Sequence, residues 1–222
     1  MKSKIIGSSL LWVAVMAIVL SSCKKEKIEG SGQIKTESRT AANFYIVEAR
    51  GSFPVTIKYS NEYSVTVKGF ENLLPKFETK VENGTLYLQY ENGVNISNDN
   101  IEVEVTLPTL TGVTSRGSNN ISVSGNFIGM DALSVSSYGS GDILIIDGNA
   151  NNLNVILSGS GNLYAFGLGV QNAIVNSAGS GNAEVNVVKT LKATLSGSGN
   201  VFYKGSPTVE ANISGSGKVI KK

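Results

Sequence analysis

Small apolar residues alternate with polar ones along the second half of the chain, and the alternation recurs at a nearly constant spacing. A Gly-Ser-Gly tripeptide or a near variant begins at six glycines, spaced 22, 20, 20, 18 and 18 residues apart. These glycines are Gly117, Gly139, Gly159, Gly179, Gly197 and Gly215. Because a period of two places alternate residues on opposite faces of a strand, each recurrence predicts a strand, a glycine turn and a second strand.

The positions expected to face inward are apolar in all six recurrences. Four residues before the first glycine stand Val113, Val135, Val155, Val175, Ala193 and Ala211. The second strand starts on Ile121, Ile143, Leu163, Ala183, Val201 and Val219. Units of about 20 residues without a helical segment predict an all-β solenoid, in which each coil pairs with the coils above and below it.

A polar residue follows most of the tripeptides, and stacked coils would align these residues in one column. The column contains Asn120, Asp142, Asn162, Asn182 and Asn200. Because stacked Asn side chains hydrogen-bond to one another, we expect a structural ladder. The alternative is a calcium site, since the pattern faintly resembles the Gly-Gly-x-Gly-x-Asp motif. A calcium site of that type needs an acidic side chain at this position of each repeat, and here only Asp142 supplies one. Its motif also recurs at a different spacing from the repeats of this chain, so no metal site is predicted.

Large apolar side chains occupy several outward positions of the second strands. They are Leu144, Tyr164, Phe166, Phe202 and Ile220, and we call them the outer stripe. Such a contiguous apolar surface exceeds what scattered surface residues produce. Either the N-terminal part of the chain or the C-terminal tail covers the stripe, or it is an interface. An interface would contact other subunits, as in a homotrimer, or a glycan or protein ligand.

Residues 34 to 112 are also β-rich but less regular than the part from 113 to 222. Alternation predicts strands over 44–49, 55–59, 63–67, 85–90 and 101–107. Asn83-Gly84 indicates a hairpin or a corner, and Glu71 to Phe77 indicates a loop or a short helical turn. Arg50-Gly51-Ser52 echoes Arg116-Gly117-Ser118, which suggests that the regular stack begins early.

The start of the chain has the pattern of an export signal. Two lysines precede an apolar run from Leu10 to Leu20, which is shorter than the roughly 20 residues that span a bilayer. At its end stands Leu20-Ser21-Ser22-Cys23, which resembles the lipobox of bacterial lipoproteins, although a chance Cys after an ordinary signal peptide is the alternative. We expect a signal peptide over 1–22, then a lipidated Cys23 with a flexible tether over 23–33. This predicts an outer membrane lipoprotein on the cell surface or the periplasmic face. Lys24 to Lys27 is either a sorting signal or an ordinary linker.

Composition excludes several kinds of chemistry. The chain has no His and one Cys, so His-based metal sites, Ser/His/Asp and Cys/His catalysis and disulfides within the chain are impossible. With 19 Lys and Arg against 17 Asp and Glu, a nucleic acid is not an expected partner. Catalysis by paired carboxylates would need Asp142 with Asp147 or with Glu184, and no basic cluster surrounds either pair. We therefore predict no enzyme activity and no cofactor.

The order of the motifs resembles the putative auto-transporter adhesin, head GIN domain family over about residues 34 to 220. The resemblance rests on the Gly-Ser-Gly array and the segments Phe44-Tyr45-Ile46, Glu71-Asn72-Leu73-Leu74-Pro75, Asn83-Gly84-Thr85-Leu86 and Pro108-Thr109-Leu110. It implies a pectin-lyase-like right-handed β-helix, an adhesion role and a lipoprotein of the Bacteroidetes type, with no catalytic residues. The predicted function is a binding or adhesion module. The alternatives are a structural envelope protein without a ligand and a carboxylate-dependent polysaccharide-cleaving enzyme.

Overall fold

The computed structural model describes residues 26–222, so the predicted signal peptide and Cys23 lie outside the described residues. The first strands are β1 (Glu26–Glu29), β2 (Ile34–Arg39), β3 (Ile46–Gly51), β4 (Val55–Tyr59), β5 (Ser64–Phe70), β6 (Phe77–Glu82), β7 (Thr85–Tyr90), β8 (Val94–Ser97) and β9 (Glu102–Leu107). They are followed by β10 (Gly112–Gly117), β11 (Ile121–Ser124), β12 (Met130–Ser137), β13 (Ile143–Ile145), β14 (Gly148–Leu157), β15 (Leu163–Ser177), β16 (Ala183–Leu195), β17 (Val201–Lys204), β18 (Thr208–Ile213) and β19 (Val219–Lys221).

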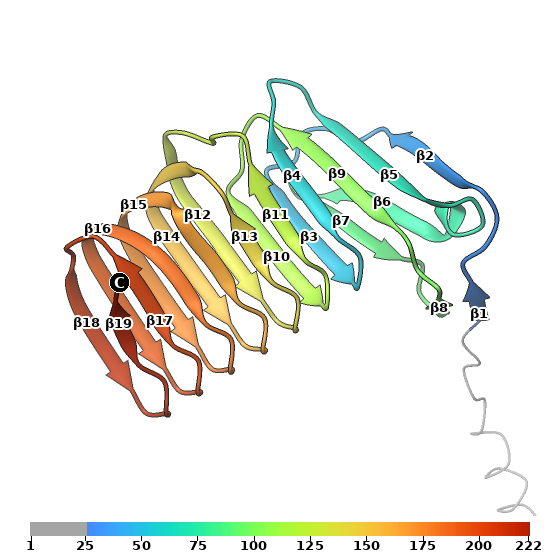
Figure 1. Ribbon diagram of the computed structural model, residues 1–222. Helices are drawn as coiled ribbons and strands as arrows, with labels where there is room; N and C mark the ends of the chain where they lie inside the picture. The colour runs from blue at the N-terminus through green and yellow to red at the C-terminus, as the bar shows by residue number, and fades with distance from the viewer. Residues whose placement is uncertain (1–25) are drawn as a thin grey trace, which may run out of the picture.

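Seventeen of these strands belong to one mixed sheet that wraps around a single core (Figure 1). From β10 to the C-terminal end the strands pair in parallel, and the inward valines stand in register from strand to strand. Val113, Val135, Val155 and Val175 are at most 1% exposed. The long strands β15 and β16 pass from one side of the core to the other. The inward-facing positions predicted from the alternation are thus buried over most of the stack.

The N-terminal part contains antiparallel strands, of which only the pair joined by Asn83-Gly84 has a signal in the sequence. Strands β2 and β5, β5 and β9, and β6 and β7 pair antiparallel. The predicted parallel right-handed β-helix is therefore wrong: the fold is all-β, but its sheet is mixed and forms a nearly closed, barrel-like wrap. Alternation of side chains has the same period in parallel and antiparallel strands, so the pattern does not distinguish them.

The turn between β6 and β7 shows why the chain reverses there. Asn83 and Gly84 have positive φ angles of 49° and 75°. Positive φ at both central residues defines the two-residue turn that joins antiparallel strands, and Asn-Gly is its preferred sequence. The hairpin interpretation of Asn83-Gly84 is therefore confirmed.

Most of the expected N-terminal elements are present. The strands predicted over 44–49, 55–59, 63–67, 85–90 and 101–107 correspond to β3, β4, β5, β7 and β9. The interruption before Phe77 contains a short 3-10 turn at Leu74–Lys76, which confirms the expected loop or helical turn. Within the segment expected to be a tether, β1 pairs in parallel with β8. In the described part of the chain, no helix is long and apolar enough to cross a membrane.

The glycine corners are stacked so closely that no side chain fits between them. A Cβ atom on Gly159 would lie 1.9 Å from the carbonyl oxygen of Gly139, and one on Gly179 would lie 1.8 Å from that of Gly159. The backbone N–H of Ser160 donates to the Gly139 carbonyl at 3.0 Å, and that of Ser180 to the Gly159 carbonyl at 3.0 Å. Glycine at these corners is required by the close approach of successive backbones.

Candidate functional site

The outer stripe is assembled by the register of the sheet. Leu144 on β13 pairs with Tyr164 on β15, and Tyr164 pairs with Glu184 on β16. Glu184 pairs with Phe202 on β17, which pairs in turn with Ile220 on β19. The structure thus brings four of the five stripe residues into one row across the strands, with Glu184 in the middle. Phe166 lies two residues beyond Tyr164 on the same face of β15.

Exposure differs between the two ends of the stripe. Leu144 is 42% exposed and Tyr164 is 39% exposed, so the described part of the chain leaves them uncovered. Phe166 and Phe202 are half-buried, and a lysine lies over each ring. Lys204 Nζ is 4.4 Å from the centre of the Phe166 ring, and Lys222 Nζ is 4.5 Å from that of Phe202. The stripe therefore combines an open apolar end with an end that lysine side chains cover.

The Asn column is a chain of hydrogen bonds along the stack. The backbone N–H of Asp142 donates to Asn120 Oδ1 at 2.9 Å, and that of Asn162 donates to Asp142 Oδ1 at 2.8 Å. The N–H groups of Asn182 and Asn200 donate in the same way to Asn162 and Asn182, at 2.9 and 3.0 Å. Each side chain thereby satisfies a backbone donor of the next corner.

The acids that a carboxylate enzyme would need are engaged in structural hydrogen bonds. Asp142 Oδ1 accepts from both the backbone and the side-chain amide of Asn162. Asp147 Oδ1 accepts from the backbone N–H of Asn126 at 2.9 Å. Among residues 26–222, no three His, Cys, Asp or Glu side chains gather in a group that would hold a metal ion.

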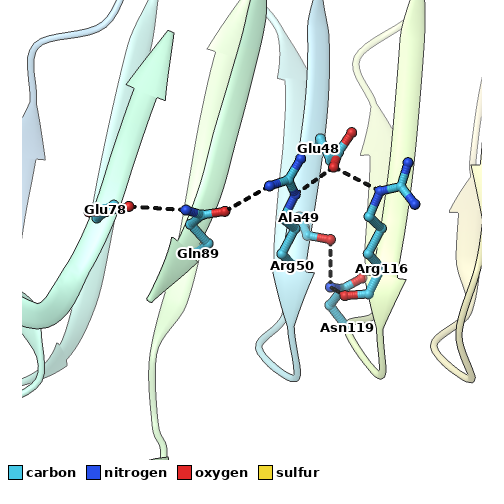
Figure 2. Close-up of polar contacts among 7 residues, drawn as sticks. All are labelled: Glu48, Ala49, Arg50, Glu78, Gln89, Arg116 and Asn119. Atoms are coloured by element: carbon cyan, nitrogen blue, oxygen red, sulfur yellow. Dashed lines mark hydrogen bonds and ion pairs between the residues drawn. The ribbon is translucent and has the colours of Figure 1, made fainter. Parts of the chain in front are cut away.

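A second polar cluster, centred on Glu48, joins strands that are far apart in the sequence. Figure 2 shows Glu48 and Arg50 on β3 beside Arg116 on β10. Glu48 Oε1 accepts from Arg50 Nε at 2.6 Å and from Arg116 Nε at 2.8 Å. We call Arg50 and Arg116 the arginine pair and Glu48 its carboxylate. The two arginines occupy paired positions of the parallel strands.

Burial and aromatic contacts fix the orientation of this cluster. The Glu48 side chain is 11% exposed, whereas those of Arg50 and Arg116 are 44% and 47% exposed. Arg50 Cζ lies 4.7 Å from the centre of the Tyr87 ring, and Arg116 Cζ lies 4.3 Å from that of Tyr138. A largely buried carboxylate therefore holds two partly exposed guanidinium groups, each stacked on a tyrosine.

Further hydrogen bonds extend the cluster along the sheet and beneath it. Arg50 Nη1 donates to Gln89 Oε1 at 3.2 Å, and Gln89 Nε2 donates to Glu78 Oε2 at 3.0 Å. Inside the corner, the fully buried Asn119 donates from Nδ2 to the Ala49 carbonyl at 2.9 Å and accepts from the Ser115 hydroxyl. The positions of β3 relative to β10 are thus fixed from both faces.

The sequence analysis did not identify the arginine pair as a site. Its only sequence signal is the echo between Arg50-Gly51-Ser52 and Arg116-Gly117-Ser118. The structure places these segments side by side, because Arg50 and Gly51 pair with Arg116 and Gly117. Glu48 carries no signal of its own, since its burial follows from β10 and β7 packing on either side of β3.

Two hollows adjoin these surfaces. One, of about 270 Å³, lies beside Arg50 and is lined by Lys80, Tyr87, Gln89 and Asn92, with Glu78 and Glu82 on its wall. The other, of about 660 Å³, lies between the connection after β9 and the loop before β12. Its lining is mainly apolar and includes Leu110, Phe127, Ile128 and Met130.

The fold defines an all-β protein with a mixed sheet, and comparison with known proteins gives its family. The family model described as "Putative auto-transporter adhesin, head GIN domain" matches residues 43–207. The chain therefore belongs to this family, and the resemblance read from its motifs is confirmed. The family is described as adhesins, a class of cell-surface binding proteins rather than enzymes. No curated protein matches the chain.

Solved structures share the fold. A protein from Bacteroides fragilis described as a putative adhesin is 22% identical, with a TM-score of 0.74, and the match covers 88% of this chain and 100% of that one. A putative adhesin from Parabacteroides merdae is 21% identical, with a TM-score of 0.55, and covers 89% and 99%. A protein from Parabacteroides distasonis described as a putative lipid binding protein is 23% identical, with a TM-score of 0.50, and covers 89% and 100%. At these identities the likeness concerns the fold alone.

Proposed function

We propose that the protein is a non-enzymatic binding or adhesion module, anchored to the outer membrane by a lipid on Cys23. The observation that carries the proposal is the open end of the outer stripe, where Leu144 and Tyr164 stand paired and exposed on neighbouring strands. The adhesin family and the lipobox-like Ser21-Ser22-Cys23 support it. The hydrogen bonds that engage Asp142 and Asp147 favour binding over carboxylate catalysis.

The stripe has the composition of a binding surface. Its apolar and aromatic side chains are interrupted by Glu184 and are flanked by Lys204 and Lys222. Aromatic residues are enriched in protein interfaces. Its side chains stand on paired strands, so little backbone entropy is lost when a partner binds. Ile146, which is 50% exposed, extends the apolar area next to Leu144. The partner is a glycan, another protein or a second copy of the chain.

The stripe is tested with a double variant and a matched control on the opposite side of the wrap. Leu144→Glu with Tyr164→Glu places charges in the stripe, whereas Ile156→Glu with Ile174→Glu changes residues of similar exposure, 39% and 44%, away from it. The chain without its signal peptide, with Cys23→Ser, is studied by light scattering and by adhesion of protein-coated beads to host matrix and to cells.

We expect the stripe variant to lose self-association, the bead adhesion or both, while the control behaves like the unsubstituted protein. Equal mass and equal adhesion in all three proteins would contradict the stripe as the binding surface. The anchor is tested separately by labelling cells with an alkyne fatty acid. Wild type should carry the label and Cys23→Ala should not, and a membrane-bound Cys23→Ala protein without label would contradict lipid anchoring.

A further inference from the structure

We infer that the arginine pair is a binding site for an acidic polysaccharide, one that carries carboxylate or sulfate groups. This inference rests on the proposed binding function and adds to it a second site and a class of ligand. It concerns strands β7, β3, β10 and β12, which are separate from the strands that carry the outer stripe.

The direction of the two guanidinium groups leaves hydrogen-bond donors for a ligand. Both arginines donate to Glu48 through Nε, so their Nη atoms remain for other partners. Arg50 Nη1 bonds to Gln89, while within residues 26–222 neither Nη of Arg116 has a hydrogen-bond partner. Arg116 is 47% exposed and its guanidinium projects beyond Glu48 in Figure 2. A planar guanidinium group with free N–H donors can form two parallel hydrogen bonds to a carboxylate or a sulfate.

The net charge of the arginine pair with its carboxylate favours an acidic ligand. Two guanidinium groups share one carboxylate, so the cluster of Glu48, Arg50 and Arg116 has a net charge of +1. Toward β12 the neighbouring outward side chains are Ser134 and Ser136, which are uncharged and can hydrogen-bond to hydroxyl groups. Their partners on β14 are Asn154 and the exposed, apolar Ile156, so no charged side chain follows in this direction. On the other side, Glu78 and Glu82 line the hollow beside Arg50. An acidic group is therefore favoured at the arginines and disfavoured farther along the hollow.

The surface across β7, β3, β10 and β12 is long enough for an extended ligand. Gln89, Arg50, Arg116 and Tyr138 follow one another across four adjacent strands, which at about 4.8 Å per strand span about 14 Å. Tyr87, the partner of Glu48 on β7, lies against Arg50. The hollow of about 270 Å³ continues from Arg50. Tyrosine rings, arginine forks, hydroxyls and amides in one line fit an extended, polyhydroxylated chain better than a single small ion. Two arginines in a nearly neutral protein do not supply the many phosphate contacts on which nucleic-acid binding depends.

A purely structural role does not explain why a carboxylate, that of Glu48, is buried at this position. Moving a carboxylate out of water costs free energy, and an apolar residue on this face of β3 would avoid that cost. What Glu48 adds is a fixed position for two like-charged side chains on neighbouring strands. Preorganised donors of this kind reduce the entropy lost when a ligand binds.

The test measures binding of polysaccharides to the soluble chain with Cys23→Ser by calorimetry in physiological salt. Polygalacturonate presents carboxylates, dextran sulfate presents sulfates and dextran is the neutral control. We expect one or both acidic polymers to bind and dextran not to bind. Arg116→Gln and Arg50→Gln should each weaken binding at least tenfold. Lys192→Gln should leave binding unchanged, because Lys192 is an exposed cation on β16 paired with Glu210.

Arg116→Lys separates recognition by the guanidinium fork from simple attraction. It keeps the charge and is expected to lose several-fold in affinity, while full affinity in this variant would overturn the assignment. Absence of binding to both acidic polymers, or unchanged binding in Arg116→Gln and Arg50→Gln, would overturn it as well. If bead adhesion still depends on Leu144 and Tyr164 in that case, the binding function stands and only the polysaccharide site fails. Circular dichroism confirms that each variant is folded.

Discussion

Arg50 and Arg116 lie at paired positions of two adjacent parallel strands, and both donate from Nε to the same oxygen of Glu48. Like charges directly opposite each other in a sheet destabilise it. The shared carboxylate removes that repulsion, and the tyrosine rings at either end hold the guanidinium planes. The stability of this part of the sheet and its binding capacity therefore depend on one side chain.

Glu48→Gln should lower the free energy of unfolding by about 1–3 kcal/mol, because the charge that strengthens both hydrogen bonds is removed and the two arginines then repel each other. The matched control is Glu104→Gln, which breaks an exposed ion pair with Lys58 whose side chains are 51% and 45% exposed. Such a pair contributes about 0–1 kcal/mol. Urea denaturation measures both. Equal effects of the two variants would show that Glu48 is no more than a surface acid.

The Asn ladder is expected to stabilise the corners of the stack. Asn162 Oδ1 accepts from the backbone N–H of Asn182, and its amide donates to Asp142. Asn162→Ala should therefore cost about 1–2 kcal/mol in the free energy of unfolding, since it leaves a backbone donor without its partner. Asn154→Ala changes an exposed Asn on the outer face and should cost about 0.5 kcal/mol or less. Thermal or urea unfolding distinguishes them, and an equally small loss in both would argue against the ladder.

Gly159→Ala should prevent the corners from stacking. The added Cβ would meet the Gly139 carbonyl oxygen at 1.9 Å, so the backbone must shift, and we expect a loss of about 3 kcal/mol or more. Gly169→Ala is the control, because a Cβ there meets no atom within 4 Å. The two variants are compared by their denaturation midpoints and by soluble yield. Similar stability of both proteins would mean that the corner spacing is looser than described.

Tyr90 is expected to make the folded protein less stable at alkaline pH. Burial raises the pKa of its hydroxyl, and the hydrogen bond to Asp99 Oδ1 at 2.6 Å raises that pKa further. The folded protein therefore keeps this proton where the unfolded chain, with an ordinary tyrosine pKa of about 10, releases it. Stability from this group is complete below about pH 10 and falls as the pH rises above that value, by up to about 1.4 kcal/mol per pH unit.

The corresponding test is the free energy of unfolding of wild type and Tyr90→Phe between pH 8 and 12. Tyr90→Phe should be less stable at pH 8, by about 1 kcal/mol for the lost hydrogen bond, but should lose less stability than wild type above pH 10. Tyr59→Phe, which removes an exposed hydroxyl bonded to Asn61, is the control at pH 8 for the loss of one tyrosine hydrogen bond. Parallel curves for wild type and Tyr90→Phe would contradict this assignment.

Much of the candidate site was visible in the sequence only as a pattern. The outward positions Leu144, Tyr164, Phe202 and Ile220 follow from alternation, and the register aligns them. The alternation did not predict that lysine side chains cover two of the rings. Lys204 lies over Phe166 and Lys222 lies over Phe202, and both lysines reach the rings from neighbouring strands.

The sequence by itself determined the strands, the inward residues, the glycine corners, the Asn83-Gly84 hairpin and the family. These features are local: a period of two, a positive φ and an absent Cβ are properties of a few consecutive residues. Only the tertiary structure decided that β5 runs antiparallel to β2 and β9, and that Glu48 lies between Arg50 and Arg116. Strand direction and the burial of a charge depend on which distant segments pair, and side-chain alternation carries no record of that choice.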